Sequence, residues 1–248
     1  MGLFSGLFGK SQPVEFVNPV KVDMHSHLLP GIDDGVDNFD EAVAMIQAFA
    51  AKGYKKLVTT PHMMADFYRN KPEEIRLLCA ELNTILKEKA IDVVVEAAAE
   101  YYLDELFAEE LCKKSLLTFG SNYVLVESSF MQAADNFSDL IFKAKIAGYQ
   151  PVLAHPERYV YMYDDFEKYR RLYDTELLFQ ININSLTGYY SKEAKKIAEQ
   201  LIKEEMVDFV GSDAHHFRNM GALEAGINTK AFQKLVAGNK LKNNELLG

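Results

Sequence analysis

Short apolar segments alternate along this chain with longer segments in which apolar residues recur every three or four positions. The short segments have the length and composition of buried strands, and the longer ones have the periodicity of amphipathic helices. Strands are predicted over seven ranges: 20–25, 56–60, 92–99, 123–127, 151–155, 178–184 and 208–212. Because strands that alternate with helices form parallel sheets, the pattern predicts an α/β fold, either a parallel barrel or a large doubly wound sheet.

Two of the predicted helices have recognisable first turns. Asn38 and Glu41 form a capping-box pattern, and Gly53 suits the end of the helix that follows them. Pro72 fits the first turn of the next helix, because an N–H group at that position has no partner within a helix. These signals place one helix after each of the first two predicted strands.

Length and composition favour a single large domain. The sequence has 248 residues, of which 48% are hydrophobic, and a chain of this size can bury one barrel-sized core. No linker-like or low-complexity stretch interrupts the alternation. We therefore expect one domain over residues 20–248, preceded by an N-terminal extension over residues 1–19.

Charge and cysteine content narrow the classes of partner and compartment. A net charge of -9 gives no electrostatic footprint for nucleic acid. Cys79 and Cys112 fall in predicted helices without CxxC spacing, which fits a reducing, cytoplasmic compartment. No stretch approaches the roughly 18 consecutive apolar residues of a membrane span.

Residues 1–10 carry Leu3, Phe4, Leu7 and Phe8 at near-helical spacing. Such a segment could be a weak interfacial anchor that holds the protein at the periphery of the inner membrane. It could equally pack on the domain as a tail or fray at the terminus. The sequence leaves these alternatives open.

Potential metal ligands gather where the predicted strands end. They are His25, His27, His62, Glu100, Glu127, His155, Asp213 and His215, and they include five of the 6 histidines in the chain. Residues two apart in an extended segment project to the same side, so the HxH and DxH pairs can each approach one ion together. In a parallel barrel the carboxyl ends of all strands share one mouth, where these side chains would meet.

The joint occurrence of these side chains distinguishes a metal site from ordinary structural roles. A lone histidine or glutamate is more often a packing, capping or ion-pair residue than a ligand. Several such groups in one cavity without metal would each have a large desolvation cost. The nitrogen and oxygen donors suit manganese, iron, zinc or magnesium, and bridging carboxylates allow two or three ions. Asp33 and Asp34 are either turn residues or a further ligand, and His216 is expected outside the ligand set.

Arg158 follows a predicted ligand by three residues. Its planar guanidinium can bind a phosphate group through two parallel hydrogen bonds, which makes it a candidate substrate clamp. The alternative is a surface ion pair. Nearby Tyr159, Tyr161 and Tyr163 could form a wall for an aromatic substrate, or could simply pack under a loop.

At these residues the sequence resembles the PHP superfamily (polymerase and histidinol phosphatase). Within it, the chain is most similar to the bacterial manganese-dependent protein-tyrosine phosphatases of capsule and exopolysaccharide synthesis. The specific segments are DMHSHLLPGIDDG (23–35), TTPH (59–62), AHPERY (154–159) and GSDAH (211–215), and the match covers nearly the whole chain after about residue 20. The resemblance implies a distorted (β/α)7 barrel with a trinuclear metal centre. One position departs from the family pattern: Met63 follows His62, where relatives commonly have a second histidine.

The resemblance also implies which residues hold each ion. One ion would take His25, His27, Glu100 and Asp213; a second would share Glu100 and add Glu127 and His155; a third would take His62, His215 and an aspartate of the Asp33–Asp34 pair, with Asp34 favoured. Arg158 matches the phosphate-binding arginine of the family. The implied substrate is the phosphotyrosine tail of a membrane tyrosine kinase that controls polysaccharide export.

The predicted activity is therefore hydrolysis of phosphotyrosine by metal-activated water. Alternatives are a PHP phosphatase for a small molecule such as histidinol phosphate, an amide or amidine hydrolase, and a metal-stabilised interaction module without activity. A thiol-based phosphatase is excluded, because such enzymes need an arginine six residues after the cysteine. Ile85 and Thr118 occupy those positions after Cys79 and Cys112.

Overall fold

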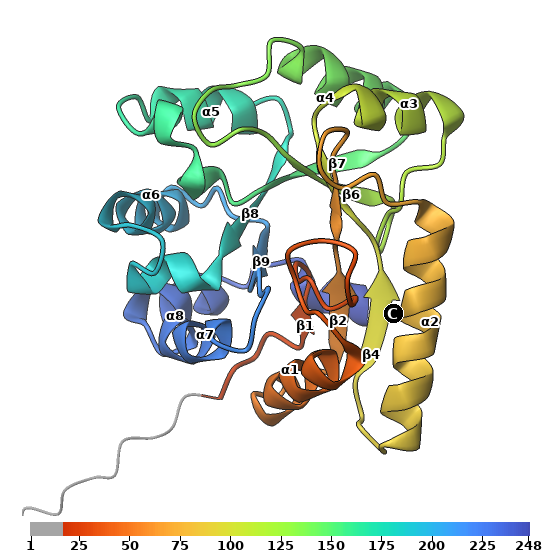
Figure 1. The fold of residues 1–248 in the computed structure, drawn as a ribbon. Coiled ribbons are helices and arrows are strands. Elements are labelled where there is room, and N and C mark those ends of the chain that lie inside the picture. The colour runs from red at the N-terminus through yellow and green to blue at the C-terminus, as the bar shows by residue number, and fades with distance from the viewer. Residues whose placement is uncertain (1–16) are drawn as a thin grey trace, which may run out of the picture.

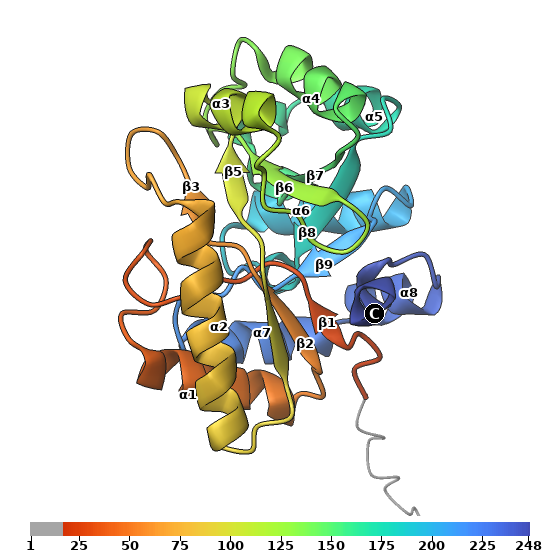
Figure 2. The same cartoon turned by 90° about the vertical axis from the view of Figure 1, so that its right-hand side faces the viewer.

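The computed structural model of the protein describes residues 17–248, and its strands form a ring that helices surround (Figures 1 and 2). One parallel sheet has the order β1 (Val22–Asp23), β2 (Lys56–Thr59), β4 (Val94–Ala97). The other has the order β3 (His62–Met63), β5 (Glu100–Tyr102), β6 (Tyr123–Glu127), β7 (Gln150–Ala154), β8 (Leu178–Asn182), β9 (Phe209–Gly211). All strand pairings within the two sheets are parallel, which confirms the predicted α/β fold.

Two short strands, β3 and β5, are additional to the predicted ones. They continue the predicted strands 56–60 and 92–99 after short breaks, the first of which contains Pro61. Proline has no N–H group for a ladder, so the strand is interrupted there. Ala98 N still donates to Thr59 O at 2.9 Å, and Glu100 N donates to Pro61 O at 3.1 Å. The interrupted strands therefore keep their places in the ring.

Helices cover the outside of the ring. They are α1 (Phe39–Ala51), α2 (Pro72–Glu88), α3 (Glu105–Lys113), α4 (Phe137–Ile146), α5 (Glu167–Tyr173), α6 (Lys192–Lys203), α7 (Asn219–Ile227) and α8 (Lys230–Ala237), with short 3-10 turns η1 (Pro156–Arg158), η2 (Val160–Met162), η3 (Ile183–Thr187) and η4 (Asn243–Leu247). The predicted helix starts are confirmed: Asn38 Oδ1 accepts from Glu41 N at 2.9 Å, and α2 begins at Pro72. The apolar stripe of α2 packs against β4 (Figure 1).

The N-terminal residues for which a membrane contact was considered, 1–10, lie outside the described residues, as does most of the expected extension 1–19. Within residues 17–248, no helix has both the length and the apolar character needed to cross a bilayer.

The ring closes between β1 and β9, which are not paired as strands, through backbone and side-chain hydrogen bonds. Just beyond the strands, Asp213 N donates to His25 O at 2.9 Å and His27 N donates to Ala214 O at 3.0 Å. At one end, Asn243 Nδ2 donates to Val22 O at 3.0 Å and to Val210 O at 2.7 Å, while its Oδ1 accepts from Val210 N at 3.0 Å. In the middle, the buried Asp23 carboxylate accepts from Ser212 N at 2.7 Å and from Ser212 Oγ at 2.9 Å. These contacts fix the two strands whose ends carry the HxH and DxH pairs.

Replacing Asn243 with alanine is expected to destabilise the fold by about 2–4 kcal/mol, because buried backbone groups of β1 and β9 lose their partners. Urea unfolding followed by circular dichroism measures this change. Asn136→Ala is the matched control, since Asn136 is exposed and its side chain makes no capping hydrogen bond. The control is expected within about 0.5 kcal/mol of the parent. Equal effects of both changes would contradict the closing role of Asn243.

Candidate metal centre

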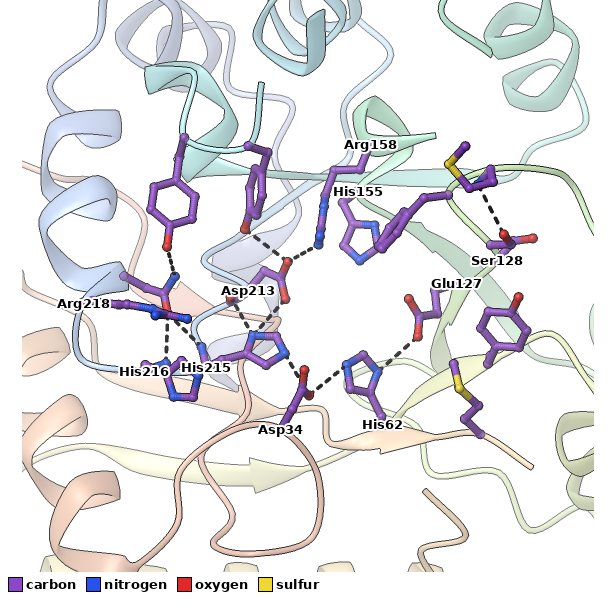
Figure 3. Close-up of a pocket in the computed structure, with 18 residues that line it drawn as sticks. Asp34, His62, Glu127, Ser128, His155, Arg158, Asp213, His215, His216 and Arg218 are labelled. Carbon is purple, nitrogen blue, oxygen red and sulfur yellow. Dashed lines mark hydrogen bonds and ion pairs between the residues drawn. The ribbon is translucent and has the colours of Figure 1, made fainter. Parts of the chain in front are cut away.

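The carboxyl ends of the strands open into one cavity of about 550 Å³. Figure 3 shows side chains of β3 and of the end of β6, together with side chains that follow β7 and β9, directed into this space. All of the residues predicted as ligands meet at this end of the ring: His25, His27, Asp34, His62, Glu100, Glu127, His155, Asp213 and His215. Residues from distant parts of the sequence thus form one cluster, as the strand-end pattern predicted.

The possible ligand atoms form four overlapping groups, each with its atoms within 4.8 Å of one another. The groups are His27, Asp34, His62, His215; His25, Glu100, His155; His25, His27, Asp213; and His62, Glu100, Glu127. Because the groups overlap, neighbouring ions would share ligands. The grouping differs in part from the sets implied by the resemblance: Glu127 lies 3.1 Å from His62 Nδ1 and is grouped with that ring, not with His155.

The rings of His25 and His27 are oriented so that a cation fits between them. Gln180 Oε1 accepts from His25 Nδ1 at 2.9 Å, and Asp33 Oδ2 accepts from His27 Nδ1 at 2.7 Å. In the neutral rings both protons are therefore on Nδ1, and the two Nε2 lone pairs face each other across 3.4 Å. With both rings neutral these lone pairs would repel, and the Glu100 carboxylate lies beside both. A proton or a divalent ion between them removes the repulsion, so the donor set fits a metal.

Ionisation in the metal-free cluster is strongly shifted. Burial opposes charge on His25 and His62, but nearby carboxylates, above all Glu100, outweigh it and raise the pKa of His25 to about 9 and of His62 to about 10. Burial also opposes charge on Glu100 and Asp213, yet the surrounding cations, with His25 foremost, hold the pKa of both carboxyls well below the usual range. Protons on imidazoles therefore balance the carboxylates when no metal is bound.

Backbone geometry at the ends of β7 and β9 is unusual. His155 and Asp213 have φ angles of 34° and 51°, in the left-handed region that disfavours residues with a Cβ. Strain of this kind is found at functional sites and also at helix ends and turns, and six other described non-glycine residues have positive φ. At Gly211 a Cβ would lie 2.6 Å from the His25 Cβ, so glycine allows β9 to pack this closely. The fold thus accepts local strain to aim these side chains.

Asp33 and Asp34 occupy different positions. Asp34 Oδ1 lies 3.5 Å from His62 Nε2 and 3.4 Å from His215 Nε2, within a ligand group. Asp33 instead accepts from the ring of His27 and from the His62 backbone N–H at 3.0 Å. This geometry favours Asp34 as the ligand and gives Asp33 an orienting role.

Arg158 enters the cavity from η1, directly after β7. Its Nη1 donates to Asp213 Oδ2 at 2.8 Å, and its guanidinium carbon lies 4.4 Å and 4.3 Å from the ring centroids of Phe130 and Tyr190. The two aromatic rings hold the cation by cation–π attraction. Arg158 thus forms its ion pair inside the cavity and not on the outer surface. Its role as a phosphate ligand stays a prediction.

The tyrosines that follow Arg158 pack beneath a loop. Tyr159 is fully buried, donates to Ala154 O at 3.0 Å and accepts from Ser128 N at 3.2 Å. Neither it nor Tyr161 nor Tyr163 lines the cavity. Of the two interpretations that the sequence left open, the structure supports packing.

Two other positions are clarified by the structure. His216 lies outside the ligand groups, as expected, and lines the rim of the cavity. Met63, which stands where relatives commonly have a second histidine, is buried in the hydrophobic core at 1% exposure. The departure at Met63 therefore affects packing and not the ligand cluster.

Several residues of the site were not predicted. Gln180 and Asn182 are polar residues two positions apart in the otherwise apolar strand β8, and alternation of this kind places both toward the same side. Gln180 orients His25, and Asn182 Nδ2 donates to Asp213 Oδ2 at 2.7 Å. The alternation of these two polar residues could have identified them from the sequence. Arg218 also lines the cavity, but nothing in its sequence context marks it.

The cysteines lie away from this chemistry. Neither lines the cavity, and Cys79 is a buried residue of α2 that donates to Val95 O at 3.3 Å. Burial raises the pKa of the Cys79 thiol to about 11, the opposite of an activated thiolate. Cys112 is exposed on α3. The structure therefore agrees with the exclusion of a thiol-based phosphatase.

Fold and site together define a parallel β/α barrel protein whose mouth is built for divalent metal ions. The family described as "Capsular polysaccharide synthesis, CpsB/CapC" matches residues 21–229. The chain belongs to this family. The resemblance to capsule-associated phosphatases drawn from the motifs is thereby confirmed.

Individual relatives agree with this assignment. Tyrosine-protein phosphatase YwqE of Bacillus subtilis (strain 168) is 30% identical over 207 residues, covering 82% of each protein. A chain from the crystal structures of YwqE from Bacillus subtilis and CpsB from Streptococcus pneumoniae, described as metal-dependent tyrosine phosphatases, superposes with a TM-score of 0.78 at 26% identity, covering 91% of this chain and 94% of that one. A histidinol phosphate phosphatase from Lactococcus lactis shares only the fold, with a TM-score of 0.53 at 13% identity, covering 87% of this chain and 94% of that one.

Metal binding near neutral pH is expected to release at least two protons per cluster, because His25 and His62 are protonated in the metal-free protein, the pKa of His215 is also raised, and ions bind neutral imidazole. Calorimetric titration in buffers of different ionisation enthalpy measures the number. Release is expected to vanish above the pKa values of about 9 and about 10. Ordinary histidine pKa values would give almost no release near neutral pH, which would contradict the shifts.

The same shifts predict how the chelated protein responds to pH. A raised histidine pKa stabilises the fold fully below the unfolded value of 6.5, and this contribution is lost as the pH rises through the folded values of about 9 and about 10. The melting temperature of the chelated protein is therefore expected to fall over this range. A melting temperature that rises with pH from 6.5 to 10 would contradict the assignment.

Proposed function

We propose that this chain is a metal-dependent protein-tyrosine phosphatase that acts on a phosphotyrosine protein in capsule or exopolysaccharide synthesis. The observation that carries the proposal is the position of Arg158, whose guanidinium lies beside a cluster of metal-binding groups in the same cavity. A phosphate dianion would be bound by positive charge from two sources, the guanidinium and the metal ions. Family membership and the names of the relatives support the same activity.

The metal centre in this proposal holds three divalent ions, with manganese favoured over iron, zinc or magnesium. The residues that would hold them are His25, His27, Asp34, His62, Glu100, Glu127, His155, Asp213 and His215. Oxygen and imidazole donors without thiolate support these metals. When bound, such ions lower the pKa of water toward neutrality and so supply a nucleophile.

The protein's own groups would orient and stabilise the phosphoryl group. Arg158 is held by Phe130, Tyr190 and Asp213, so its fork is already ordered before substrate binds. Preorganised charge of this kind acts most strongly on the transition state, where charge spreads over the equatorial oxygens. The phenolate leaving group has a pKa near 10 and needs less protonation than an alkoxide.

We further propose that the substrate is the tail of a membrane tyrosine kinase, with the phosphatase in the cytoplasm next to the inner membrane. Residues 20–248 would act as one domain, and residues 1–10 would add a weak membrane contact. These proposals derive from the resemblance and from the apolar spacing of residues 1–10. The absence of a membrane-spanning helix in residues 17–248 is compatible with them.

Replacing Arg158 with alanine is expected to lower kcat/KM for phosphotyrosine by about 10² or more, with metal content unchanged. Arg158→Lys is expected to recover only part of the loss, because lysine keeps the charge but not the planar fork. Steady-state kinetics and elemental analysis of each variant measure the two quantities. Arg171→Ala is the control, since Arg171 is 65% exposed and pairs with Asp165. Full activity in the alanine variant would remove Arg158 from the mechanism.

Chelation is expected to abolish turnover, and added manganese to restore it, because the nucleophile depends on bound metal. Phosphotyrosine peptides are expected to be hydrolysed with higher kcat/KM than histidinol phosphate. Phosphate release from both substrates, before and after chelation, checks both points. Turnover of histidinol phosphate alone would favour the small-molecule phosphatase, and a metal-loaded protein inert toward all phosphoesters would favour the interaction module.

A further inference from the structure

A second groove adjoins the metal-centre cavity. It has a volume of about 530 Å³ and is lined by Glu41, Ala44 and Met45 of α1 and by His216, Phe217 and Arg218 of the loop between β9 and α7. His216 and Arg218 also line the metal-centre cavity. The two spaces therefore share a wall, and a ligand that fills the cavity can extend into the groove.

Phe217 is the conspicuous side chain of this groove, because it is 60% exposed. Its loop is nevertheless well fixed: Asn219 Oδ1 accepts from His215 N at 3.2 Å and from His216 N at 2.9 Å, and Met220 N donates to Phe217 O at 3.0 Å. An ordered backbone thus presents a large apolar ring to water. A ligand that covered the ring would gain the free energy of removing it from water.

Other exposed apolar side chains surround the same mouth. Met131 is 71% exposed after β6, and Tyr189 is 43% exposed after β8. Met131 and Tyr189 line the metal-centre cavity itself. Single exposed apolar residues are common on proteins, but a set that rims one cavity marks a binding surface. A small phosphorylated metabolite would fit inside the cavity and leave this rim uncovered.

The polar groups of the groove leave an apolar floor. The Glu41 carboxylate accepts from Asp37 N at 3.2 Å and from Asn38 Nδ2 at 3.2 Å, so it is engaged in capping α1. Ala44 and Phe217 supply the exposed apolar surface, Met45 is almost fully buried at 1% exposure, and His216 and Arg218 form the wall shared with the metal-centre cavity. In an extended peptide, side chains two residues apart project to the same side at a spacing of about 7 Å. A peptide with its phosphotyrosine in the cavity can therefore place such a neighbour in the groove.

We propose that this groove, with the exposed side chains of Ala44 and Phe217 as its apolar surface, binds an apolar side chain two positions from the phosphotyrosine of an extended peptide substrate. The inference rests on the proposed phosphatase function and specifies its substrate class: a polypeptide selected by its neighbouring residue as well as by its phosphotyrosine. Phe217 and Ala44 then determine specificity and do not touch the reacting atoms.

The test compares phosphotyrosine peptides that differ only in having leucine or glycine two positions before or after the phosphotyrosine, with free phosphotyrosine as the small substrate. The parent protein, loaded with manganese, is expected to prefer a leucine peptide by about tenfold in kcat/KM, equivalent to about 1.4 kcal/mol. Phe217→Ala is expected to abolish the preference while leaving free phosphotyrosine turnover unchanged. Ala44→Gln, a change on α1 that fills the groove without touching the loop, is expected to do the same.

Matched controls lie on remote helices. Phe142→Ala removes an aromatic ring that is 63% exposed on α4, and Ala80→Gln enlarges an exposed alanine on α2. Both are expected to keep the leucine preference. If the parent shows no preference, or if neither groove variant alters it, the groove is not a peptide subsite. Equal losses on peptides and on free phosphotyrosine would also overturn the inference. If no phosphotyrosine compound is hydrolysed at all, the proposed function itself fails.

Discussion

The concentration of like-charged and lone-pair-bearing groups at the barrel mouth is the constraint on which the rest of the structure depends. His25 and His27 present their Nε2 atoms to each other at 3.4 Å, with the buried Glu100 carboxylate beside both. Groups of this kind cannot be gathered in a desolvated space unless positive charge accompanies them. Protons provide that charge in the metal-free protein, and metal ions are the functional alternative. The fold can therefore form this cluster only when protons or metal ions taken from solution balance its negative charge.

Much of the surrounding structure serves to hold these groups at their positions. Gln180 and Asp33 fix the ring orientation of the two histidines from behind, and Asn182 fixes Asp213. The seam between β1 and β9 brings the first and last ligand pairs together, and backbone hydrogen bonds join the residues just beyond the two strands. The positions of the ligands therefore depend on the residues around the cluster, on the strand ends and on the contacts that close the ring.

Sequence-based prediction succeeded for the fold and for the gathering of the potential ligands, but not for the short strands or for the residues around Arg158. Periodicity identified the parallel α/β fold, and the strand-end rule brought His62 and His155 into one site. The same reasoning did not foresee β3 and β5. Pro61 marks the first break, but pairing after it depends on the neighbouring strand, where His62 pairs with Glu100. Phe130 and Tyr190 were also beyond this reasoning, since contacts with Arg158 across the cavity depend on loop geometry that has no periodic signal.

The divided use of the Asp213 carboxylate has a thermodynamic consequence. Oδ1 faces His25 at 3.5 Å on the metal-binding side, while Oδ2 accepts from Arg158 at 2.8 Å. One carboxylate therefore serves both the ligand cluster and the arginine proposed as the phosphate clamp. A metal ion held by Asp213 would draw charge from its hydrogen bond to Arg158 and would leave the guanidinium freer to bind an anion. By linkage, an anion bound at Arg158 would raise the affinity for that metal by the same factor.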